Sequence, residues 1–321
     1  MAIMTIGFNP AIDRILECPD FHIGGHQQAR QVARLAAGKA ANVNRALAQL
    51  GCDSLATGFV GATDVEFFHE QLMACGPGRV LCRFVEAAGK TRENISILDP
   101  KRRVETHLRD KGFTVTPEEA GFLQQRILHE LKPGDFAIFS GSVDVGLEAG
   151  YFGALLDKCT AAGARVIVDS SGPPLRIAAE RELWLIKPNL EELRSLLGVE
   201  VPNAAAAIRD VAAPLLKTTR NVLITRGPLG AVLLTQSGAY SARLTTKDMP
   251  VRTVGCGDHL LAGFISEMTG TQGETTSEEH VEKALATALA VATARAMSAN
   301  LEEFDPALAT GARASIAIER I

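Results

Sequence analysis

Short apolar runs alternate with longer amphipathic stretches over the second half of the chain. The run 135–140 (DFAIFS) precedes a stretch of helical periodicity, and the same order returns after the run 164–169 (ARVIVD). Strands that alternate with helices predict a doubly wound α/β fold, a parallel sheet with helices on both faces. From residue 116 on we expect strands at 135–140, 164–169, 184–187 and 222–225, a hairpin of 231–235 and 239–244, and helices at 117–131, 147–162, 190–197, 204–216, 259–268 and 278–299.

The first third of the chain also alternates, but charged stretches interrupt it. Asn9-Pro10 breaks the first strand, and Gly51 stops a strongly amphipathic helix. The charged segments near residues 80–112 are typical of a half-exposed sheet. We expect strands at 3–8 and 55–60, helices at 43–50 and 64–74, and a small lid sheet built from about 11–35 and 80–112, on a single domain of residues 1–321.

Composition narrows the class of protein. The 321 residues are 46% hydrophobic and 22% charged, which is typical of a globular protein with a large core. A net charge of −4 gives no basic footprint for nucleic acid. The six cysteines lack a CxxC pair, which disfavours a zinc site or disulfide framework. No apolar run is long enough to span a membrane and no signal peptide is visible, so we expect a cytoplasmic protein.

A glycine-rich stretch at 251–264 (VRTVGCGDHLLAGF) combines a helix start with a carboxylate. Gly255 and Gly257 flank Cys256, and Asp258 precedes the apolar run of the expected helix. Backbone N–H groups at a helix start attract anions, because the helix dipole favours negative charge there. Asp258 is therefore either a common N-cap residue or a general base beside an anion site.

Polar residues that follow the strands are further candidates, because ligands bind beyond the carboxyl ends of parallel strands. Gly38 and Lys39 open a helix and form a candidate anion site, with Asn42 one turn further on. The alternative is an ordinary surface lysine, and the spacing is not that of a Walker A motif. Asp13 follows the first strand and is either a turn residue or an acceptor for two sugar hydroxyls.

Three more sites have both a structural and a functional interpretation. Arg92 in the expected lid is a surface residue or a bidentate partner for phosphate. Asn189 and Glu192, just after Lys187, share a helix face and form either a capping box or a water-mediated Mg²⁺ site. The segment 225–230 is a tight turn or a place of close approach to a nucleotide, and its relevant residues are Thr225, Gly227 and Gly230.

Taken in order, these pieces resemble the PfkB/ribokinase family of sugar kinases, in particular its 1-phosphofructokinase and tagatose-6-phosphate kinase branch. The resemblance spans nearly the whole chain, from FNPAID at 8–13 to the last helix. It is carried by the motifs AAGK at 36–39, TREN at 91–94, GFTVTP at 112–117, SGS at 140–142, DSS at 169–171, KPN at 187–189 and TVGCGD at 253–258.

The resemblance implies a ribokinase-like fold and ATP-dependent phosphorylation of a sugar hydroxyl with Mg²⁺. It makes Asp258 the base and gives the anion hole to the N–H groups of Gly255, Cys256 and Gly257. It implies further roles for three groups of residues: sugar binding by Asp13, Gly38 and Asn42; phosphate binding by Lys39, Arg92 and a serine, Ser140 or Ser142; ATP and Mg²⁺ binding by Lys187, Asn189, Glu192, Thr225, Gly227, Gly230 and Gly257.

The chain departs from the family pattern at Ala40, at 143–146 (VDVG), at Cys256 and at His259, and none of these departures removes a catalytic group. We expect a kinase for fructose 1-phosphate, with tagatose 6-phosphate and fructose 6-phosphate as alternatives. A catalytically silent sugar-phosphate sensor is the rival from another class. A dinucleotide-dependent dehydrogenase is disfavoured, because no GxGxxG follows the first strand. The family also suggests a homodimer formed through the lid.

Overall fold

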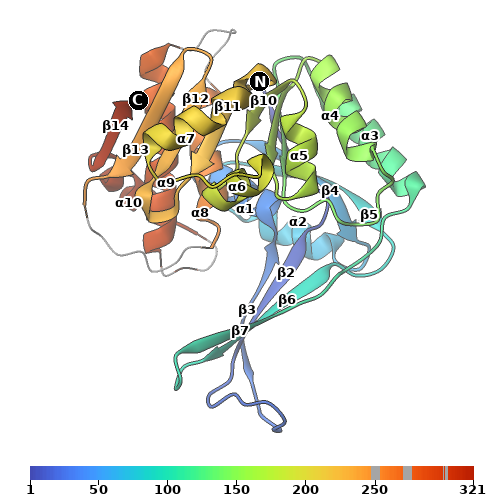
Figure 1. The fold of residues 1–321 in the computed structure, drawn as a ribbon. Coiled ribbons are helices and arrows are strands. Elements are labelled where there is room, and N and C mark those ends of the chain that lie inside the picture. Colours follow the sequence, from blue (N-terminus) through green and yellow to red (C-terminus); the bar gives the residue numbers. More distant parts are fainter. Residues whose placement is uncertain (247–253, 270–276, 299, 301–302) are drawn as a thin grey trace.

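The computed structural model describes residues 1–246, 254–269, 277–298, 300 and 303–321. A ten-stranded sheet forms the main body, and a four-stranded sheet projects from it (Figure 1). The large sheet has the order β14-β13-β12-β11-β10-β9-β8-β1-β4-β5. Its strands are β1 Ile3–Gly7, β4 Ser54–Gly61, β5 Val80–Ala87, β8 Phe136–Ser140, β9 Arg165–Asp169, β10 Leu183–Ile186, β11 Thr219–Thr225, β12 Ala231–Thr235, β13 Gly238–Leu244 and β14 Ile316–Arg320.

The strands from β5 to β11 are parallel, and β12, β13 and β14 continue the sheet in antiparallel register. From β1 the chain winds outward to β4 and β5, and then returns to β8 and continues the other way. The order therefore reverses between β1 and β8, and such a switch point opens a crevice at the carboxyl ends of the strands. The predicted doubly wound α/β fold is confirmed.

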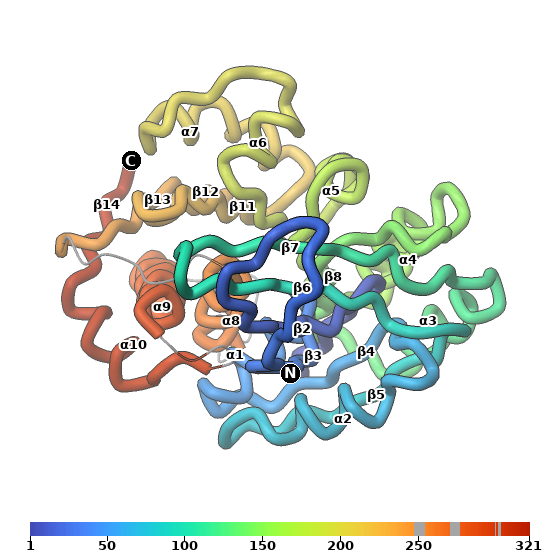
Figure 2. Tube along the Cα trace, turned by 90° about the horizontal axis from the view of Figure 1, so that it is seen from below, coloured from blue at the N-terminus to red at the C-terminus, as the bar shows by residue number. Residues whose placement is uncertain are grey.

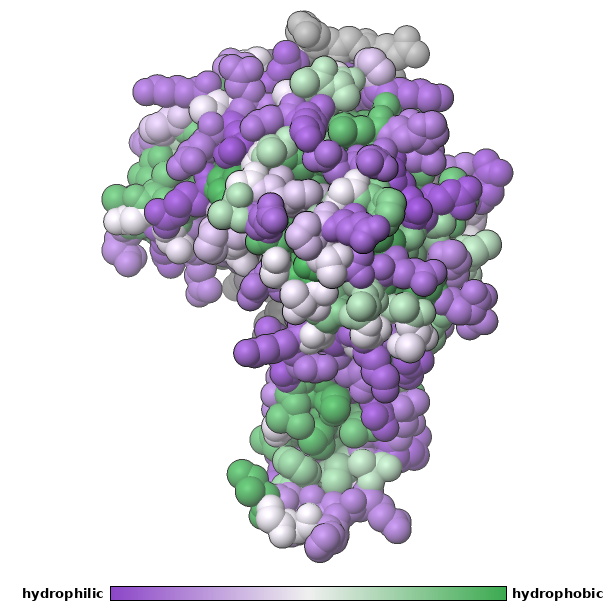
Figure 3. Space-filling model, turned by 90° about the vertical axis from the view of Figure 1, so that its right-hand side faces the viewer, coloured by the Kyte–Doolittle hydropathy of each residue, from purple (hydrophilic) through white to green (hydrophobic). Residues whose placement is uncertain are grey.

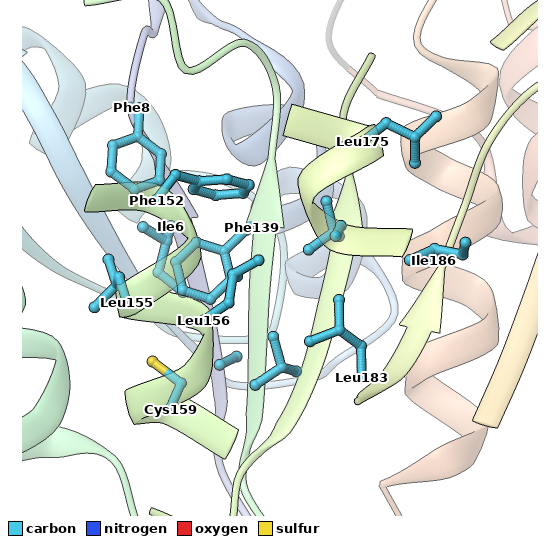
Figure 4. Close-up of a cluster of buried hydrophobic side chains, with 14 of the residues drawn as sticks. Ile6, Phe8, Phe139, Phe152, Leu155, Leu156, Cys159, Leu175, Leu183 and Ile186 are labelled. Atoms are coloured by element: carbon cyan, nitrogen blue, oxygen red, sulfur yellow. The ribbon is translucent and has the colours of Figure 1, made fainter. Parts of the chain in front are cut away.

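Helices cover both faces of the large sheet (Figure 1). One apolar cluster lies under α3 to α7, and Figure 4 shows its part between α4, α5 and the strands, where Phe8, Phe139 and Phe152 meet. A second cluster lies under α1, α8, α9 and α10. The helices are α1 Lys39–Gln49, α2 Val65–Met73, α3 Pro117–Glu130, α4 Tyr151–Ala161, α5 Pro173–Ala179, α6 Leu190–Leu197, α7 Ala205–Ala212, α8 Cys256–Met268, α9 Glu278–Met297 and α10 Pro306–Arg313.

The small sheet, called the lid sheet below, has the strand order β3-β2-β6-β7. Seen from below, it lies over the middle of the main body (Figure 2). The inclusion of residues 80–87 in the lid is wrong, because β5 pairs with β4 at the edge of the large sheet. Charged side chains on β5 reflect that edge position. The lid strands are β2 Ala11–Glu17, β3 Arg30–Ala37, β6 Arg92–Asp99 and β7 Val104–Arg109.

Other differences from the expected elements arise from proline and glycine. Helices α5 and α10 were not predicted, because each begins at a proline. Proline disrupts the interior of a helix but is favoured in its first turn. Helix α4 begins at Tyr151 rather than at 147, because Gly150 takes a left-handed conformation as its N-cap. Strand β14 was also not predicted and joins the sheet beside β13.

Gly58 is a position where the sheet requires glycine. It pairs with Gly7 and has φ +125°, and an added Cβ would lie 1.9 Å from the Gly7 carbonyl oxygen. We expect Gly58→Ala to lower the free energy of unfolding by more than about 2 kcal/mol, measured by urea denaturation.

The matched control is Gly121→Ala in the interior of α3, where an added Cβ meets nothing within 4 Å. It should raise the free energy of unfolding by about 0.5–1 kcal/mol. Equal effects of the two substitutions would contradict the close approach of β1 and β4.

Candidate functional site

The site lies where two helices begin beside the switch point. Helix α1 starts after Gly38, which has φ +108°, and α8 starts after Gly255, which has φ +79°. Conformations of this kind favour glycine, and they turn each chain sharply into its helix. The first N–H groups of both helices have no partner within their own helix and can receive an anion. Of the predicted stretch 251–264, residues 251–253 lie outside the described part of the chain.

Asp258 stands in the first turn of α8 and is 5% exposed. Asn42 Nδ2 donates to its Oδ2 at 2.8 Å, so the first turns of α1 and α8 are in contact. Burial and the negative charge of Asp169 raise the pKa of Asp258 to about 6, against the opposing influence of Lys39, Asn42 and Lys187. A carboxylate that titrates near neutrality suits a general base.

Asp169 is the residue whose role sequence reasoning missed. It ends β9, is fully buried, and its Oδ1 lies 2.8 Å from Lys39 Nζ and 3.1 Å from Lys187 Nζ. Burial alone would raise the pKa of Asp169, but the two ammonium groups lower it below its usual value. The same pair raises the pKa of Lys39, although burial acts in the other direction. The sequence signal that could have indicated this role is a charged residue directly at the end of an apolar strand.

Asn189 and Glu192 form the capping box of α6. Glu192 N donates to Asn189 Oδ1 and Asn189 N donates to Glu192 Oε2, both at 2.8 Å. The other carboxylate oxygen, Oε1, lies 4.0 Å from Lys39 Nζ. The structural interpretation of this pair is therefore confirmed, and one oxygen still faces the site.

The Thr225–Gly230 turn lies next to this cap. Thr225 forms a parallel bridge with Asn189, and its N–H donates to the Pro188 carbonyl at 3.1 Å. Gly227 and Gly230 both have positive φ, at +58° and +88°. Lys187 Nζ lies 3.4 Å from the position that a Cβ on Gly257 would take, so the end of β10 approaches the start of α8.

Asp13 lies within strand β2 of the lid sheet, not in a turn after the first strand. Its Oδ1 accepts a hydrogen bond from Asn94 Nδ2 at 2.8 Å across the β2–β6 pair. Arg92 donates through Nε and Nη2 to the Pro10 and Asn9 carbonyls, both at 3.1 Å. These two bonds fix the turn between β1 and β2. Arg92 was expected only as a phosphate-binding residue, so this structural contact was not predicted.

Ser140 ends β8 beside the same crevice. Its hydroxyl oxygen is buried and has no hydrogen-bond partner within the described residues. A Cβ added to the neighbouring Gly141 would lie 3.8 Å from Lys39 Cβ. The Ala40 methyl, which departs from the family pattern, faces the end of β1 at Gly7.

His259 has a structural explanation that the sequence did not supply. Its Nδ1 lies 2.9 Å from the Gly255 carbonyl oxygen, so the proton of the neutral ring sits on Nδ1. Its ring packs edge-on against Phe304 at 5.7 Å. Burial lowers the pKa of His259 to about 3, and Arg295 and Arg45 act in the same direction. The neighbouring Cys256 is half-buried, and burial raises the pKa of its thiol, which disfavours a reactive thiolate.

Asp169→Asn tests the buried ion pairs. We expect it to lower the free energy of unfolding by about 3 kcal/mol, because Lys187 stays buried without its anionic partner. The control is Asp53→Asn, which removes an exposed pair with Arg79 and should change stability little. Urea denaturation measures both variants, and equal losses would contradict a structural role for Asp169.

The neutral state of His259 makes stability depend on pH. A histidine with its pKa lowered from 6.5 to about 3 stabilises the fold fully above pH 6.5 and progressively less as the pH falls toward 3. Between pH 7 and pH 5 this loss amounts to about 2 kcal/mol. The variant His259→Asn retains a donor for Gly255 but cannot titrate, so its unfolding free energy should fall less over the same range. Parallel pH profiles of the two proteins would refute a neutral His259.

The chain is similar to known carbohydrate kinases over most of its length. The model of the pfkB family carbohydrate kinases matches residues 3–303. The 1-phosphofructokinase of Bacillus subtilis is 30% identical over 265 residues, 82% of this chain and 84% of the relative. The tagatose-6-phosphate kinase of Staphylococcus epidermidis is 29% identical over 285 residues, 88% and 89% of the two chains.

A solved structure of phosphofructokinase-2 from Escherichia coli superimposes with a TM-score of 0.88 over 98% of both chains, at 22% identity, which supports the fold alone. Within the described residues, no helix is both long and apolar enough to cross a membrane. The predicted family and reaction class are confirmed: this chain belongs to the pfkB family of carbohydrate kinases, phosphotransferases that act on a sugar hydroxyl.

Proposed function

We propose that this protein transfers the γ-phosphoryl group of ATP to a hydroxyl of fructose 1-phosphate, with Asp258 as the general base. The observation that carries the proposal is the position of Asp258. This buried carboxylate, with a pKa near 6, stands at the start of α8 beside Lys39 and Lys187. Phosphoryl transfer depends on positioning and charge stabilisation, and this arrangement supplies both.

In the proposed reaction the sugar hydroxyl gives its proton to Asp258 as its oxygen bonds to the γ-phosphorus. The bond from that phosphorus to the bridging oxygen breaks, and ADP leaves with the bond's electrons. The N–H groups of Gly255, Cys256 and Gly257 stabilise the transferring phosphoryl group. Lys187, held by Asp169 and close to Gly257, adds a positive charge at the same place.

We assign the sugar to Asp13, Gly38 and Asn42, of which Asp13 and Asn42 offer hydrogen-bonding side chains. The phosphate already on the substrate is assigned to Lys39, Arg92 and Ser140. The buried hydroxyl of Ser140 lacks a partner within the described residues, which fits a ligand oxygen. Lys39 retains 35% of its side-chain exposure while paired with Asp169, so it can contact a ligand as well.

The donor set also fits MgATP. We assign the nucleotide to Lys187, Asn189, Thr225, Gly227, Gly230 and Gly257. The Asn189–Glu192 cap uses one carboxylate oxygen of Glu192, and the second would hold Mg²⁺ through its waters. When bound, Mg²⁺ neutralises charge on the phosphates.

A homodimer through the lid sheet belongs to the same proposal. Figure 3 shows apolar surface on the projecting sheet. Among its residues Val32 and Leu108 are 43% and 52% exposed. Covering such a surface with a second copy would remove it from water.

Tagatose 6-phosphate and fructose 6-phosphate are the alternative substrates, and the relatives support the former. Fructose 1-phosphate stands first because relatives from both Bacillus subtilis and Escherichia coli are named 1-phosphofructokinase. A coupled ADP-release assay with these three sugar phosphates, fructose and ribose decides between them. Binding of a sugar phosphate without turnover would favour the sensor. Turnover of unphosphorylated sugars alone would contradict the roles of Lys39 and Arg92.

Asp258→Asn tests the base. We expect kcat to fall by about 10³-fold with a smaller change in KM, because the substituted amide cannot accept the proton. In the unsubstituted enzyme kcat/KM should fall about tenfold per pH unit below pH 6, as Asp258 becomes protonated. Steady-state kinetics from pH 5 to pH 8 measure both. Full activity in a folded Asp258→Asn protein would refute the mechanism.

A further inference from the structure

The side-chain amide of Asn42 lies between two charged groups of opposite sign. Its Nδ2 donates to Asp258 Oδ2 at 2.8 Å, and its Oδ1 accepts from Arg45 Nη1 at a longer 3.4 Å. Asn42 and Arg45 are three residues apart in α1 and therefore share one face of the helix. The amide is thus a bridge between a guanidinium and the proposed base.

Arg45 is buried in an unusual way for a cation. It is 4% exposed, and its Nη2 donates to the Ala36 carbonyl at 2.9 Å. Within the described residues its buried Nε has no hydrogen-bond partner, and no carboxylate lies within 4.0 Å of its nitrogens. A buried charge without a direct counter-ion is costly, so its retention needs a compensating role. The Asn42 amide links it to the buried carboxylate of Asp258.

The polarity of the amide follows from this arrangement. A guanidinium only donates hydrogen bonds, so it holds the amide oxygen and turns the amide nitrogen toward Asp258. Asp258 Oδ2 then always accepts from Asn42. The reactive proton must go to the other carboxylate oxygen, Oδ1.

We propose that Arg45 is a positioning residue, which holds the Asn42 amide so that Asp258 keeps Oδ2 bonded and presents Oδ1 to the substrate hydroxyl. The proposal rests on the proposed role of Asp258 as the base. It extends to the lid, because the second bond of Arg45 joins the end of β3 at Ala36 to the same network.

Other charged groups also influence the pKa of Asp258. A test of Arg45 must therefore leave these groups unchanged. Asp169 from β9 raises its pKa, and Lys39 from α1 and Lys187 after β10 lower it. None of these three bonds to Arg45.

Cys256 and His259 lie in the same first turn of α8 as Asp258, and Arg295 of α9 acts on both. The neutral His259 bonds to Gly255 rather than to Arg45 or Asn42. Replacing Arg45 leaves this bond in place, although it removes one of the charges that lower the pKa of His259.

The test compares two substitutions of Arg45. Arg45→Met removes the positive charge and all hydrogen-bond donors, while Arg45→Lys keeps the charge and a single ammonium donor group. Carboxyl carbon-13 NMR of the ligand-free protein measures the titration of Asp258, identified by its loss in Asp258→Asn. In Arg45→Met the Asp258 pKa should rise by about one unit, which corresponds to the loss of about one hydrogen bond to the ionised form. Arg45→Lys should show a smaller rise.

Kinetics provide a second readout. In Arg45→Met the pH below which kcat/KM falls should rise together with the NMR titration. At pH 6 kcat should fall about fivefold, more than KM changes, because a smaller share of Asp258 is ionised. Asn42→Ala should reproduce the shift, and Arg45→Met added to it should shift the titration no further.

The control is Asn44→Ala in the same helix. Asn44 is 1% exposed and bonds to Thr5, Ala40 and Ser54, away from Asp258. This variant should lose stability and leave the Asp258 titration unchanged.

An unmoved titration in folded Arg45→Met, equal shifts in the methionine and lysine variants, or the same shift in Asn44→Ala would overturn the proposal. If Arg45→Met does not fold, Arg45→Lys with Asn42→Ala decides: an unmoved titration in both overturns it. An unsubstituted protein without kinase activity would refute the proposed function, while the NMR titration would still report on the Arg45–Asp258 link.

Discussion

The ion pairs of Asp169 with Lys39 and Lys187 are the contacts on which the geometry of the site depends. The three residues come from β9, from α1 and from the end of β10, on opposite sides of the switch point between β1 and β8. A buried ion pair contributes little net stability, because desolvation offsets the attraction, but removing one partner is costly. These pairs therefore hold two ammonium groups in fixed positions at the carboxyl edge of the sheet.

The same charges set the state of Asp258. Its pKa near 6 results from burial and from Asp169, reduced by the lysines and by Asn42. The lysines keep the carboxylate more ionised than burial alone would allow, and burial makes it a stronger base than an exposed aspartate. One buried anion thus both holds the two ammonium groups and raises the pKa of Asp258.

Local sequence signals predicted much of the fold and part of the site. Apolar runs located the central strands, and helix α6 was predicted with its observed bounds, because its capping box and apolar face are local signals. Gly38, Lys39, Asn42 and Asp258 were found from helix-start signals, and the structure brings them together. The partners of these residues could not be found in this way. Lys39 and Asp169 are separated by 130 positions, and only the register of the sheet brings them together.

Errors in the prediction have the same physical origin. Strand β5 resembles a lid strand in composition, because an edge strand and a half-exposed sheet both carry charged side chains on the face that is exposed to solvent. Arg45 looks like an ordinary helix residue, since no local pattern shows that its face of α1 is buried against the lid. Whether a charged side chain is solvated or buried is a property of the packed molecule, and this decides which charges can act on the site.

The connection between lid and site follows from the course of the chain. Strand β3 passes through Gly38 directly into α1, and a Cβ on Gly38 would lie 3.3 Å from Pro10 Cα, at the root of β2. Lid strands β2 and β3 therefore meet the main body at the same place. Ala11 of β2 pairs with Ala37 of β3, directly before the helix that carries Lys39 and Asn42. Because Arg45 joins Ala36 of β3 to Asn42, the contact between lid and main body and the alignment of Asp258 belong to one hydrogen-bond network.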